Sequence, residues 1–293
     1  MIKYVLLTGG SGGIGSSILN KLLKEPMYHI IVTYRKDEQL SLFESMGYNR
    51  ITPLRADLTE ADDIKTTSEA VKRIVGKKGL YALINCAGLA DATPLAYASE
   101  KKARDLMEVN YFTPMMLTKY LLNELKVYSH KNDVGARVLN VTSWAGVVAQ
   151  PFIPFYNASK FAIMGFSESI YYDLKLDGIH VVSVIPGITI TPLLSKTTSS
   201  AFEAISTASN SEKEKYEKNF SMFANDPSQG PMARFLSTSD QAANRIIKIL
   251  DKKRPKARYS IANDAKVMDV FVAKLLPTRL RLGMMKRMYG LKT

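Results

Sequence analysis

Short apolar segments alternate along the chain with longer stretches of helical period. The apolar segments show almost no alternation with polar residues, as expected for strands that are covered on both faces. They lie at residues 4–8, 29–34, 51–55, 81–85, 137–143, 180–185 and 258–261. Helical patterns lie between them at 14–24, 62–75, 99–127, 156–176 and 239–250. This repetition predicts an α/β fold: one doubly wound domain of Rossmann type with a mainly parallel sheet of about seven strands.

The last part of the chain differs from the rest in charge. Residues 251–293 contain 12 Lys or Arg and three Asp, so they carry +9 of the net charge of +13. We therefore divide the chain into a Rossmann-type domain over 1–262 and a C-terminal helical extension over 263–293. After Pro277, the residues Leu280, Met284 and Met288 recur every four positions with cations between them, which predicts a basic amphipathic helix.

Such a helix can lie peripherally on an anionic membrane surface. A solvated helix that packs on a neighbouring subunit is an equal alternative. Nucleic-acid binding is not expected, because neither base-stacking aromatic residues nor a known reader motif accompanies the charge.

The composition excludes several classes of protein. A single cysteine, Cys86, cannot form an internal disulfide framework, and no paired Cys or His spacing predicts a metal site. No apolar run approaches the roughly 18 to 20 residues of a membrane span, and the run at 4–7 is too short for a secretory signal. We expect a soluble protein of the reducing cytoplasm, with peripheral membrane contact as the open question.

A glycine-rich turn follows the first predicted strand directly. It reads Thr8-Gly9-Gly10-Ser11-Gly12-Gly13-Ile14-Gly15, and a helical pattern begins there. Glycine allows positive φ and close backbone approach, and the N-terminus of the helix presents free N–H groups to an anion. In this context the turn is typical of a dinucleotide pyrophosphate site, although clustered glycines alone could form a merely flexible turn.

The second predicted strand ends in Thr33-Tyr34-Arg35-Lys36, where a dinucleotide-binding unit that prefers NAD(H) would place an acidic residue on the ribose. Arg35 can grip a 2′-phosphate and Lys36 can add a second charge, so NADP(H) is favoured over NAD(H). The alternative is a pair of solvated surface charges.

Candidate acid–base residues lie near the start of the helix at 156–176. Tyr156 and Lys160 are one turn apart on the same face, and the strand before them ends at Ser143. A nearby ammonium favours the phenolate form of a tyrosine, so the pair can exchange a proton with a hydroxyl or carbonyl group. Alone, this spacing also occurs in exposed amphipathic helices.

Taken in order, these motifs resemble the short-chain dehydrogenase/reductase family of the Tyr-x-x-x-Lys type. The resemblance covers roughly residues 1–262. It rests on the glycine turn, Asn85-Cys86-Ala87-Gly88, Asn110, Ser143, Tyr156 with Lys160, and Pro186-Gly187. One departure is Cys86, where the family usually has Asn; we interpret it as core packing.

The resemblance implies roles for individual residues. Tyr156 would be the general acid/base, Ser143 would orient the substrate, Lys160 would bind the nicotinamide ribose and lower the pKa of Tyr156, and Asn110 would hold a water in a proton relay. Ser143 and Tyr156 would be the residues that touch the substrate. The cofactor would be bound by Gly9, Ser11, Gly13, Ile14, Gly15, Arg35, Lys36, Asp57, Asn85, Gly88, Tyr156, Lys160, Pro186, Gly187, Ile188 and Thr191.

The resemblance also implies a lid over the substrate pocket at 192–235. Apolar residues precede Tyr156 and recur in this lid, which favours an apolar substrate such as a lipid, steroid, retinoid or long-chain alcohol, unless they are ordinary core and dimer packing. They are Trp144, Phe152, Ile153, Phe155, Leu193, Leu194, Met222 and Phe223. We therefore expect an NADP(H)-dependent oxidoreductase that acts on an alcohol or ketone carbon.

The family default is a homodimer or homotetramer formed through the helices at 99–127 and 156–176. The alternative function is a non-catalytic dinucleotide-binding regulatory protein, or a membrane-surface interaction protein, on the same fold.

Overall fold

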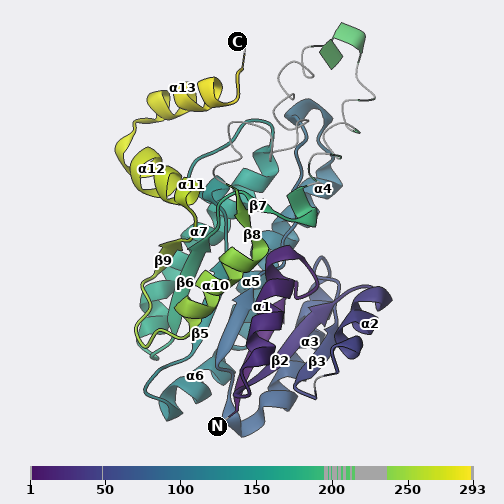
Figure 1. Cartoon of the computed structure of the whole chain (residues 1–293), viewed down its shortest axis with the longest axis vertical. Coiled ribbons are helices and arrows are strands. Elements are labelled where there is room, and N and C mark those ends of the chain that lie inside the picture. The colour runs from purple at the N-terminus through teal and green to yellow at the C-terminus, as the bar shows by residue number, and fades with distance from the viewer. Residues whose placement is uncertain are drawn as a thin grey trace.

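The computed structural model describes residues 2–47, 49–194 and 236–291, together with isolated positions between 197 and 214. Seven strands form one parallel sheet in the order β3-β2-β1-β4-β5-β6-β9, which confirms the predicted Rossmann-type fold (Figure 1). These strands are β1 (Lys3–Thr8), β2 (Tyr28–Tyr34), β3 (Ile51–Arg55), β4 (Ala82–Asn85), β5 (Arg137–Val141), β6 (His180–Ile185) and β9 (Arg258–Ser260).

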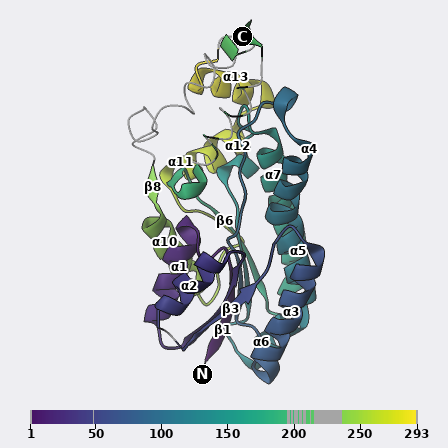
Figure 2. The same ribbon diagram turned by 90° about the vertical axis from the view of Figure 1, so that its right-hand side faces the viewer.

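Helices cover both faces of the sheet, as Figure 2 shows edge-on. One layer contains α1 (Gly13–Lys24), α2 (Asp37–Ser45) and α10 (Ser239–Leu250). The other contains α3 (Ala61–Val75), α4 (Glu100–Met107), α5 (Thr113–Tyr120), α6 (Leu122–Lys131) and α7 (Pro154–Lys175). Short 3₁₀ segments connect them at η1 (Gly76–Lys78), η2 (Leu95–Tyr97) and η4 (Trp144–Gly146). Because both faces are covered, the central strands are rich in apolar residues: Val5, Leu6 and Leu7 of β1 have no exposed surface.

The prediction of a single helix over 99–127 is wrong in detail. The chain forms α4, then a π-helix, η3 (Glu108–Phe112), and then α5 and α6. Pro114 explains part of this break, because it has no N–H to donate to the carbonyl of Asn110, its α-helical partner. A π-helical turn widens the helix, and such turns are frequent at functional sites.

A second, small sheet joins two distant segments. β7 (Thr189–Ile190) pairs in parallel with β8 (Ser237–Thr238). Most of the lid predicted at 192–235, including Met222 and Phe223, lies outside the described residues. The two strands therefore hold together the chain entering and leaving that segment.

The C-terminal extension turns back onto the carboxyl end of the sheet. It contains α11 (Asn263–Lys266), the π-helix η6 (Val267–Val272), α12 (Ala273–Leu275) and α13 (Thr278–Met288), drawn in yellow in Figure 1. Its buried residues form a second apolar core with residues of the main domain: Trp144, Val147, Val148, Met164, Ile185, Ala262, Ala265, Met268, Val272, Met285 and Tyr289.

This packing corrects one expectation. Met284 and Met288 were expected on the apolar face of a surface helix, but both pack against this second core. Leu280 is exposed, and so is Leu282.

Candidate active site

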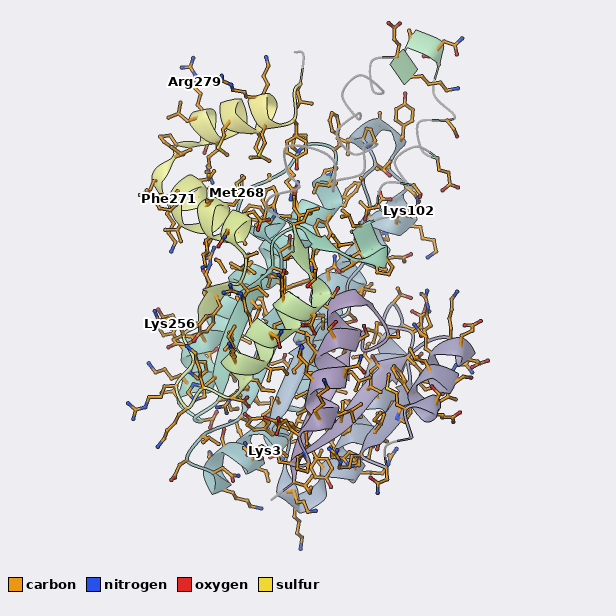
Figure 3. The ribbon with its side chains drawn as sticks, viewed as in Figure 1. Lys3, Lys102, Lys256, Met268, Phe271 and Arg279 are labelled. Carbon is orange, nitrogen blue, oxygen red and sulfur yellow. The ribbon has the colours of Figure 1, made fainter. Side chains whose placement is uncertain are left out.

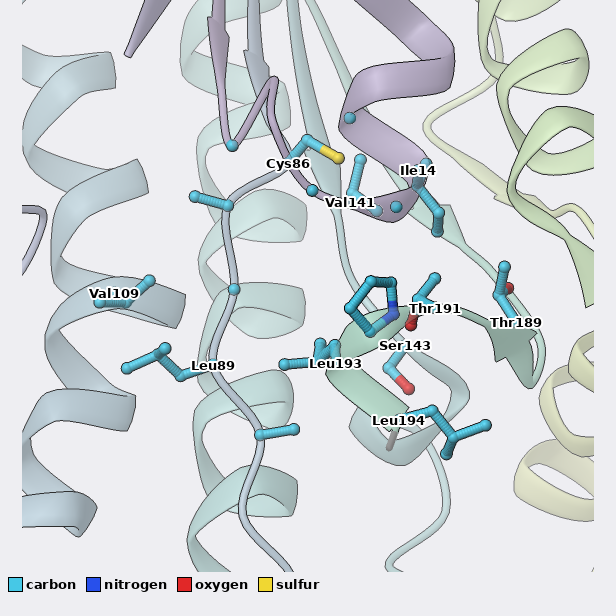
Figure 4. Close-up of a pocket in the computed structure, with 18 of the residues that line it drawn as sticks. Ile14, Cys86, Leu89, Val109, Val141, Ser143, Thr189, Thr191, Leu193 and Leu194 are labelled. Carbon is cyan, nitrogen blue, oxygen red and sulfur yellow. The ribbon is translucent and has the colours of Figure 1, made fainter. Parts of the chain in front are cut away.

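A cleft of about 500 Å³ lies at the carboxyl ends of the central strands. Parallel α/β sheets bind ligands at this edge, where the strand order reverses between β1 and β4. Figure 4 shows a part of its wall, where Ser143 lies beside Leu193, Leu194 and Thr191. The cleft reaches from the glycine turn and Arg35 at one end to Ser143, Tyr156 and Lys160 at the other.

The glycine turn has the close contacts that its sequence predicts. Gly9 has φ +72°, and a β-carbon there would lie 2.7 Å from the Cα of Ala87. A β-carbon at Gly15 would overlap the carbonyl oxygen of Gly9. The backbone of the turn is therefore bare on the cleft side at the N-terminus of α1, which fits a bound pyrophosphate.

A glutamine that the sequence analysis missed connects this turn to β2. Gln39 of α2 accepts hydrogen bonds through Oε1 from the backbone N–H groups of Arg35 (2.8 Å) and Lys36 (3.0 Å). Its Nε2 donates to Ser11 Oγ at 2.7 Å. One side chain thus fixes the predicted 2′-phosphate residues relative to the pyrophosphate turn.

The cationic end of the cleft contains Arg35 but not Lys36. Arg35 lines the cleft, and its Nη1 lies 3.7 Å from Asp57 Oδ2. Lys36 is exposed and is not among the lining residues. Arg35 is therefore the cation best placed for a 2′-phosphate, while the assignment of Lys36 stays a prediction.

Asp57 remains ionised beside Arg35. Partial burial alone would raise the pKa of its carboxyl group, but two hydrogen bonds from Thr59 and the charges of Arg35 and Lys101 outweigh that effect. The pKa of Asp57 is therefore held below its usual value. An ionised acceptor beside a cation suits a site that recognises both the amino group of an adenine and a phosphate.

Ser143, Tyr156 and Lys160 meet at the other end. Ser143 caps η4 directly after β5 and shares a side-chain hydrogen bond with Tyr156. Tyr156 lies in the first turns of α7, and the ammonium of Lys160 is 5.7 Å from the centre of its ring. Lys160 is only 5% exposed and donates to the carbonyl oxygen of Val141 at 3.3 Å. The structure thus brings together the three residues predicted from their spacing.

Burial controls the protonation states of Lys160 and Tyr156. Burial lowers the pKa of Lys160 to about 8, with a small opposing effect of Cys86. Burial raises the pKa of Tyr156, and the hydrogen bond with Ser143 only partly offsets the increase. The protein alone therefore keeps Tyr156 as a neutral phenol, the form that can donate a proton.

The side chain of Asn110 is used inside the protein. Its Oδ1 accepts from the backbone N–H of Leu89 at 2.9 Å, and its Nδ2 donates to Leu89 O and Ser159 Oγ, both also at 2.9 Å. A water at Asn110 would therefore be held by the main-chain carbonyl oxygen. That oxygen has no α-helical hydrogen-bond donor, because residue 114 is a proline without an N–H group. The predicted relay role stays a prediction.

Asn85 is the last residue of β4 and Cys86 follows it; of the two, only Cys86 lines the cleft. Asn85 is buried and does not line the cleft; its Nδ2 donates to Asn140 Oδ1 at 2.7 Å. Burial raises the pKa of the Cys86 thiol to about 12, so it stays protonated and agrees with the core-packing interpretation. Gly88 does line the cleft, where a β-carbon would lie 3.7 Å from the ammonium of Lys160.

The loop after β6 closes the nicotinamide end. Pro186, Gly187, Ile188 and Thr191 line the cleft as predicted. The backbone of Ile188 is already used, however: its N–H donates to Asp264 Oδ2 at 2.7 Å, and its carbonyl accepts from the N–H of Ser237 at 3.0 Å. Contact of Ile188 with a cofactor would therefore be through its side chain.

Other lining residues escaped the sequence analysis. Gln150 and Asp91 both line the cleft, and Asp91 is buried with Lys102 Nζ at 3.7 Å. Asp264 touches the cleft loop from the extension. None lies in a motif with a readable spacing, and Gln39 follows a lysine at the N-cap of α2, where the capping-box signature would have Ser or Thr.

Comparisons with known proteins agree with this geometry. The "short chain dehydrogenase" family matches residues 3–201. An NADPH-dependent 3-dehydrocapnine reductase of Ornithobacterium rhinotracheale is 29% identical over 279 residues, which are 95% of this chain and 94% of the relative.

Two solved structures share the fold. A short-chain dehydrogenase from Streptomyces avermitilis has a TM-score of 0.75 and 23% identity, covering 100% of this chain and 99% of that one. A short-chain dehydrogenase from Sphingobium yanoikuyae in complex with NADPH has a TM-score of 0.69 and 18% identity, covering 97% and 95%. With two thirds of its length matched by the family and the serine, tyrosine and lysine side chains gathered in one cleft, the chain belongs to the short-chain dehydrogenase family of oxidoreductases.

Proposed function

We propose that the protein is an NADP(H)-dependent oxidoreductase that transfers a hydride between the nicotinamide and the alcohol or ketone carbon of an apolar substrate. The observation that carries the proposal is one continuous cleft with Arg35 and the glycine turn at one end and Ser143, Tyr156 and Lys160 at the other. When bound, the cofactor supplies or accepts the hydride.

The protein's own residues handle the proton. In the reductive direction, the neutral phenol of Tyr156 donates its proton to the carbonyl oxygen, and Ser143 holds that oxygen by a hydrogen bond. The positive charge of Lys160 stabilises the phenolate that remains and binds the nicotinamide ribose. The main-chain carbonyl of Asn110 holds the water through which Tyr156 regains its proton.

Cofactor preference rests on Arg35. Its guanidinium can form two parallel hydrogen bonds with a 2′-phosphate, whereas the 2′-hydroxyl of NADH offers it no charge. The neighbouring carboxylate of Asp57 weakens this preference, which keeps NAD(H) as the alternative.

An apolar substrate is supported by the walls near Tyr156. Trp144, Ile153, Leu193 and Leu194 line this part of the cleft, and Figure 4 shows the two leucines beside Ser143. Apolar walls with a few polar groups bind substrates through burial and orient them through the polar groups. The relative named as a 3-dehydrocapnine reductase supports reduction of a ketone.

Cofactor binding and turnover test the proposal. Fluorescence titration should give tighter binding of NADPH than of NADH, and Arg35→Asp should reverse the order. Oxidation of NADPH should be faster with 2-dodecanone than with diacetyl, and Tyr156→Phe should abolish it without changing the Kd for NADPH. Tyr172→Phe is the matched control, because Tyr172 lies on the same helix but is 74% exposed. A cofactor-binding protein that turns over no carbonyl compound would favour the non-catalytic alternative.

We also propose that the protein forms a homodimer or homotetramer through the helices of the α4–α7 layer. Phe161, Tyr172 and Leu176 of α7 are exposed by 43%, 74% and 90%, and Phe112 is exposed by 38% at the end of η3. Large apolar side chains gathered on one helix layer are typical of subunit interfaces. Sedimentation equilibrium would test this, and Leu176→Glu should shift the mass toward the monomer.

A peripheral membrane contact is proposed for the extension. Six large apolar side chains are exposed there: Val267, Val270, Phe271, Leu275, Leu280 and Leu282. The exposed charged residues among the described part of the extension are all cations, and Figure 3 shows Phe271 and Arg279 at its outer edge. No helix among the described residues is long and apolar enough to cross a membrane. A basic and apolar face suits the surface of an anionic bilayer in the cytoplasm.

Vesicle co-sedimentation separates this contact from the enzymatic role. The full chain should bind phosphatidylglycerol-containing vesicles, and the double variant Lys274→Glu/Arg279→Glu should bind them less while keeping its turnover. Binding that is equal for both proteins, or equal on neutral phosphatidylcholine vesicles, would contradict the proposed contact.

A further inference from the structure

The C-terminal extension reaches the cleft at two separate points. One is Asp264, at the start of α11, and the other is Tyr289, just after α13. Both residues are buried, with 4% and 7% of their surface exposed. Their polar atoms point to residues that line the cleft rather than to solvent.

Asp264 holds the backbone of the loop at the nicotinamide end. Its Oδ2 accepts the N–H of Ile188 at 2.7 Å, and a β-carbon at Gly187 would overlap the same carboxyl group. The carboxylate thus lies directly against Gly187 and Ile188. Burial raises the pKa of Asp264, and the hydrogen bond from Ile188 partly offsets that effect. Burying a carboxyl group costs free energy that an apolar side chain would not cost. The position of Asp264 against this loop therefore indicates a role that an apolar residue could not perform.

Tyr289 holds the wall at the substrate end. Its hydroxyl donates to Gln150 Oε1 at 2.6 Å. The backbone of Gln150 is fixed separately, since its N–H donates to Asn157 Oδ1 at 3.2 Å and its carbonyl accepts from Asn157 Nδ2 at 2.8 Å. The main chain of Gln150 is therefore positioned by α7, and its side chain by the extension.

The extension is itself firmly attached beneath the site. Met268, Val272 and Met285 pack with Trp144 and Ile185 in the second apolar core, and Arg258 of β9 pairs with Asp269 of η6. Ser260 also donates to Asp269 Oδ2 at 2.6 Å. Asp264 and Tyr289, which contact residues of the cleft wall, are thus carried by a segment that packs firmly on the main domain.

We infer that Asp264 and Tyr289 are positioning residues of the active site: Asp264 fixes the loop 186–188 against which NADP(H) binds, and Tyr289 fixes the Gln150 side chain against which the substrate binds. The inference rests on the proposed function, because it assigns these two walls to cofactor and substrate. It makes the extension a part of the active site and not only a surface helix.

Four variants of the full-length protein test the two contacts. Asp264→Ala removes the acceptor of the Ile188 N–H, whereas Asp264→Asn keeps a carbonyl oxygen there. Tyr289→Phe removes only the hydroxyl. Asp269→Asn is the matched control, since Asp269 is an equally buried acid of the same extension whose partners, Arg258 and Ser260, do not line the cleft.

The expected results differ between the variants. Asp264→Ala should raise the Kd for NADPH at least ten-fold with a small change in Tm, and Asp264→Asn should recover most of the affinity. Tyr289→Phe should leave the Kd for NADPH unchanged and raise the KM for 2-dodecanone several-fold with little change in kcat. Asp269→Asn should lower Tm and leave the Kd for NADPH within two-fold.

Three outcomes would overturn the inference. The first is wild-type affinity for NADPH in Asp264→Ala, and the second is an unchanged KM in Tyr289→Phe. The third is an equal loss of affinity in Asp264→Ala and Asp269→Asn, which would mean that the extension acts only through general stability. A wild-type protein that binds neither NADPH nor NADH would instead refute the proposed function, and the assigned roles would be refuted with it.

Discussion

Removing the buried charge of Lys160 should make the protein more stable while it inactivates the site. The ammonium is 5% exposed, and among the described residues it has no carboxylate partner, only the carbonyl oxygen of Val141 at 3.3 Å. Burial lowers its pKa from 10.5 to about 8. At about 1.4 kcal/mol per pKa unit, keeping this group charged in the folded protein costs about 3 kcal/mol at neutral pH.

Lys160→Met replaces the ammonium with an apolar chain of similar length. It loses the hydrogen bond to Val141, worth about 1 kcal/mol, so the variant should gain about 2 kcal/mol in free energy of unfolding at pH 7. The sign of the pH dependence of this stability difference follows from proton binding. Between pH 8 and 10.5 the unfolded chain binds more protons at Lys160 than the folded protein does, so the wild type becomes relatively more stable as pH rises. The gain of the variant should therefore shrink by about 2 kcal/mol between pH 7 and pH 9.5.

Urea unfolding of the cofactor-free protein measures both effects. Trp144 is the only tryptophan, and it is 2% exposed, so its fluorescence reports the core beside the site. Lys119→Met, an exposed position on α5, is the control and should change the free energy of unfolding by less than about 0.5 kcal/mol. A variant less stable than the wild type at pH 7, or a gap that does not change with pH, would refute the reasoning.

Three further predictions concern the same cleft. The kcat/KM for NADPH in the reductive direction should fall as pH rises through about 8, because Lys160 then loses its proton while the raised pKa of Tyr156 keeps the phenol neutral; a flat profile from pH 7 to 9.5 would contradict this assignment. Gln39→Ala should weaken NADPH binding about five-fold, equivalent to one lost hydrogen bond of about 1 kcal/mol, with little effect on Tm; unchanged titration would show that Gln39 does not organise the site. Gly187→Ala should weaken NADPH binding more than ten-fold, because the new β-carbon overlaps Asp264; an unchanged Kd for NADPH would contradict the close contact between this loop and Asp264.

The strands were predictable because their burial is simple. Each central strand is covered on both faces, so its sequence is rich in Val, Ile and Leu and does not alternate with polar residues. Helix α2 escaped because Phe43 is its only buried residue, which gives almost no apolar periodicity. The two-residue strands β7 and β8 are too short for any pattern. The break near Asn110 could have been found, since Pro114 is visible in the sequence.

The residues of the site also divide into those that the sequence predicts and those that it does not. Tyr156 and Lys160 were predictable because one helix turn fixes their distance, and Ser143 because it follows a strand of the sheet. Asp264 contacts Ile188 across 76 residues, and Tyr289 contacts Gln150 across 139. Contacts of this kind depend on how the extension packs, and no local spacing encodes that.

The second apolar core offsets the stability cost of the buried Lys160. A buried cation without a carboxylate partner lowers the free energy of unfolding, and the burial of apolar side chains raises it. Trp144 and Ile185 flank that edge, and the extension covers both with Met268, Val272 and Met285. Burying three such side chains contributes roughly 5 kcal/mol or more, which exceeds the cost of the charge. The inner face of the extension therefore contributes folding stability that offsets the cost of the buried Lys160, while its basic outer face stays exposed.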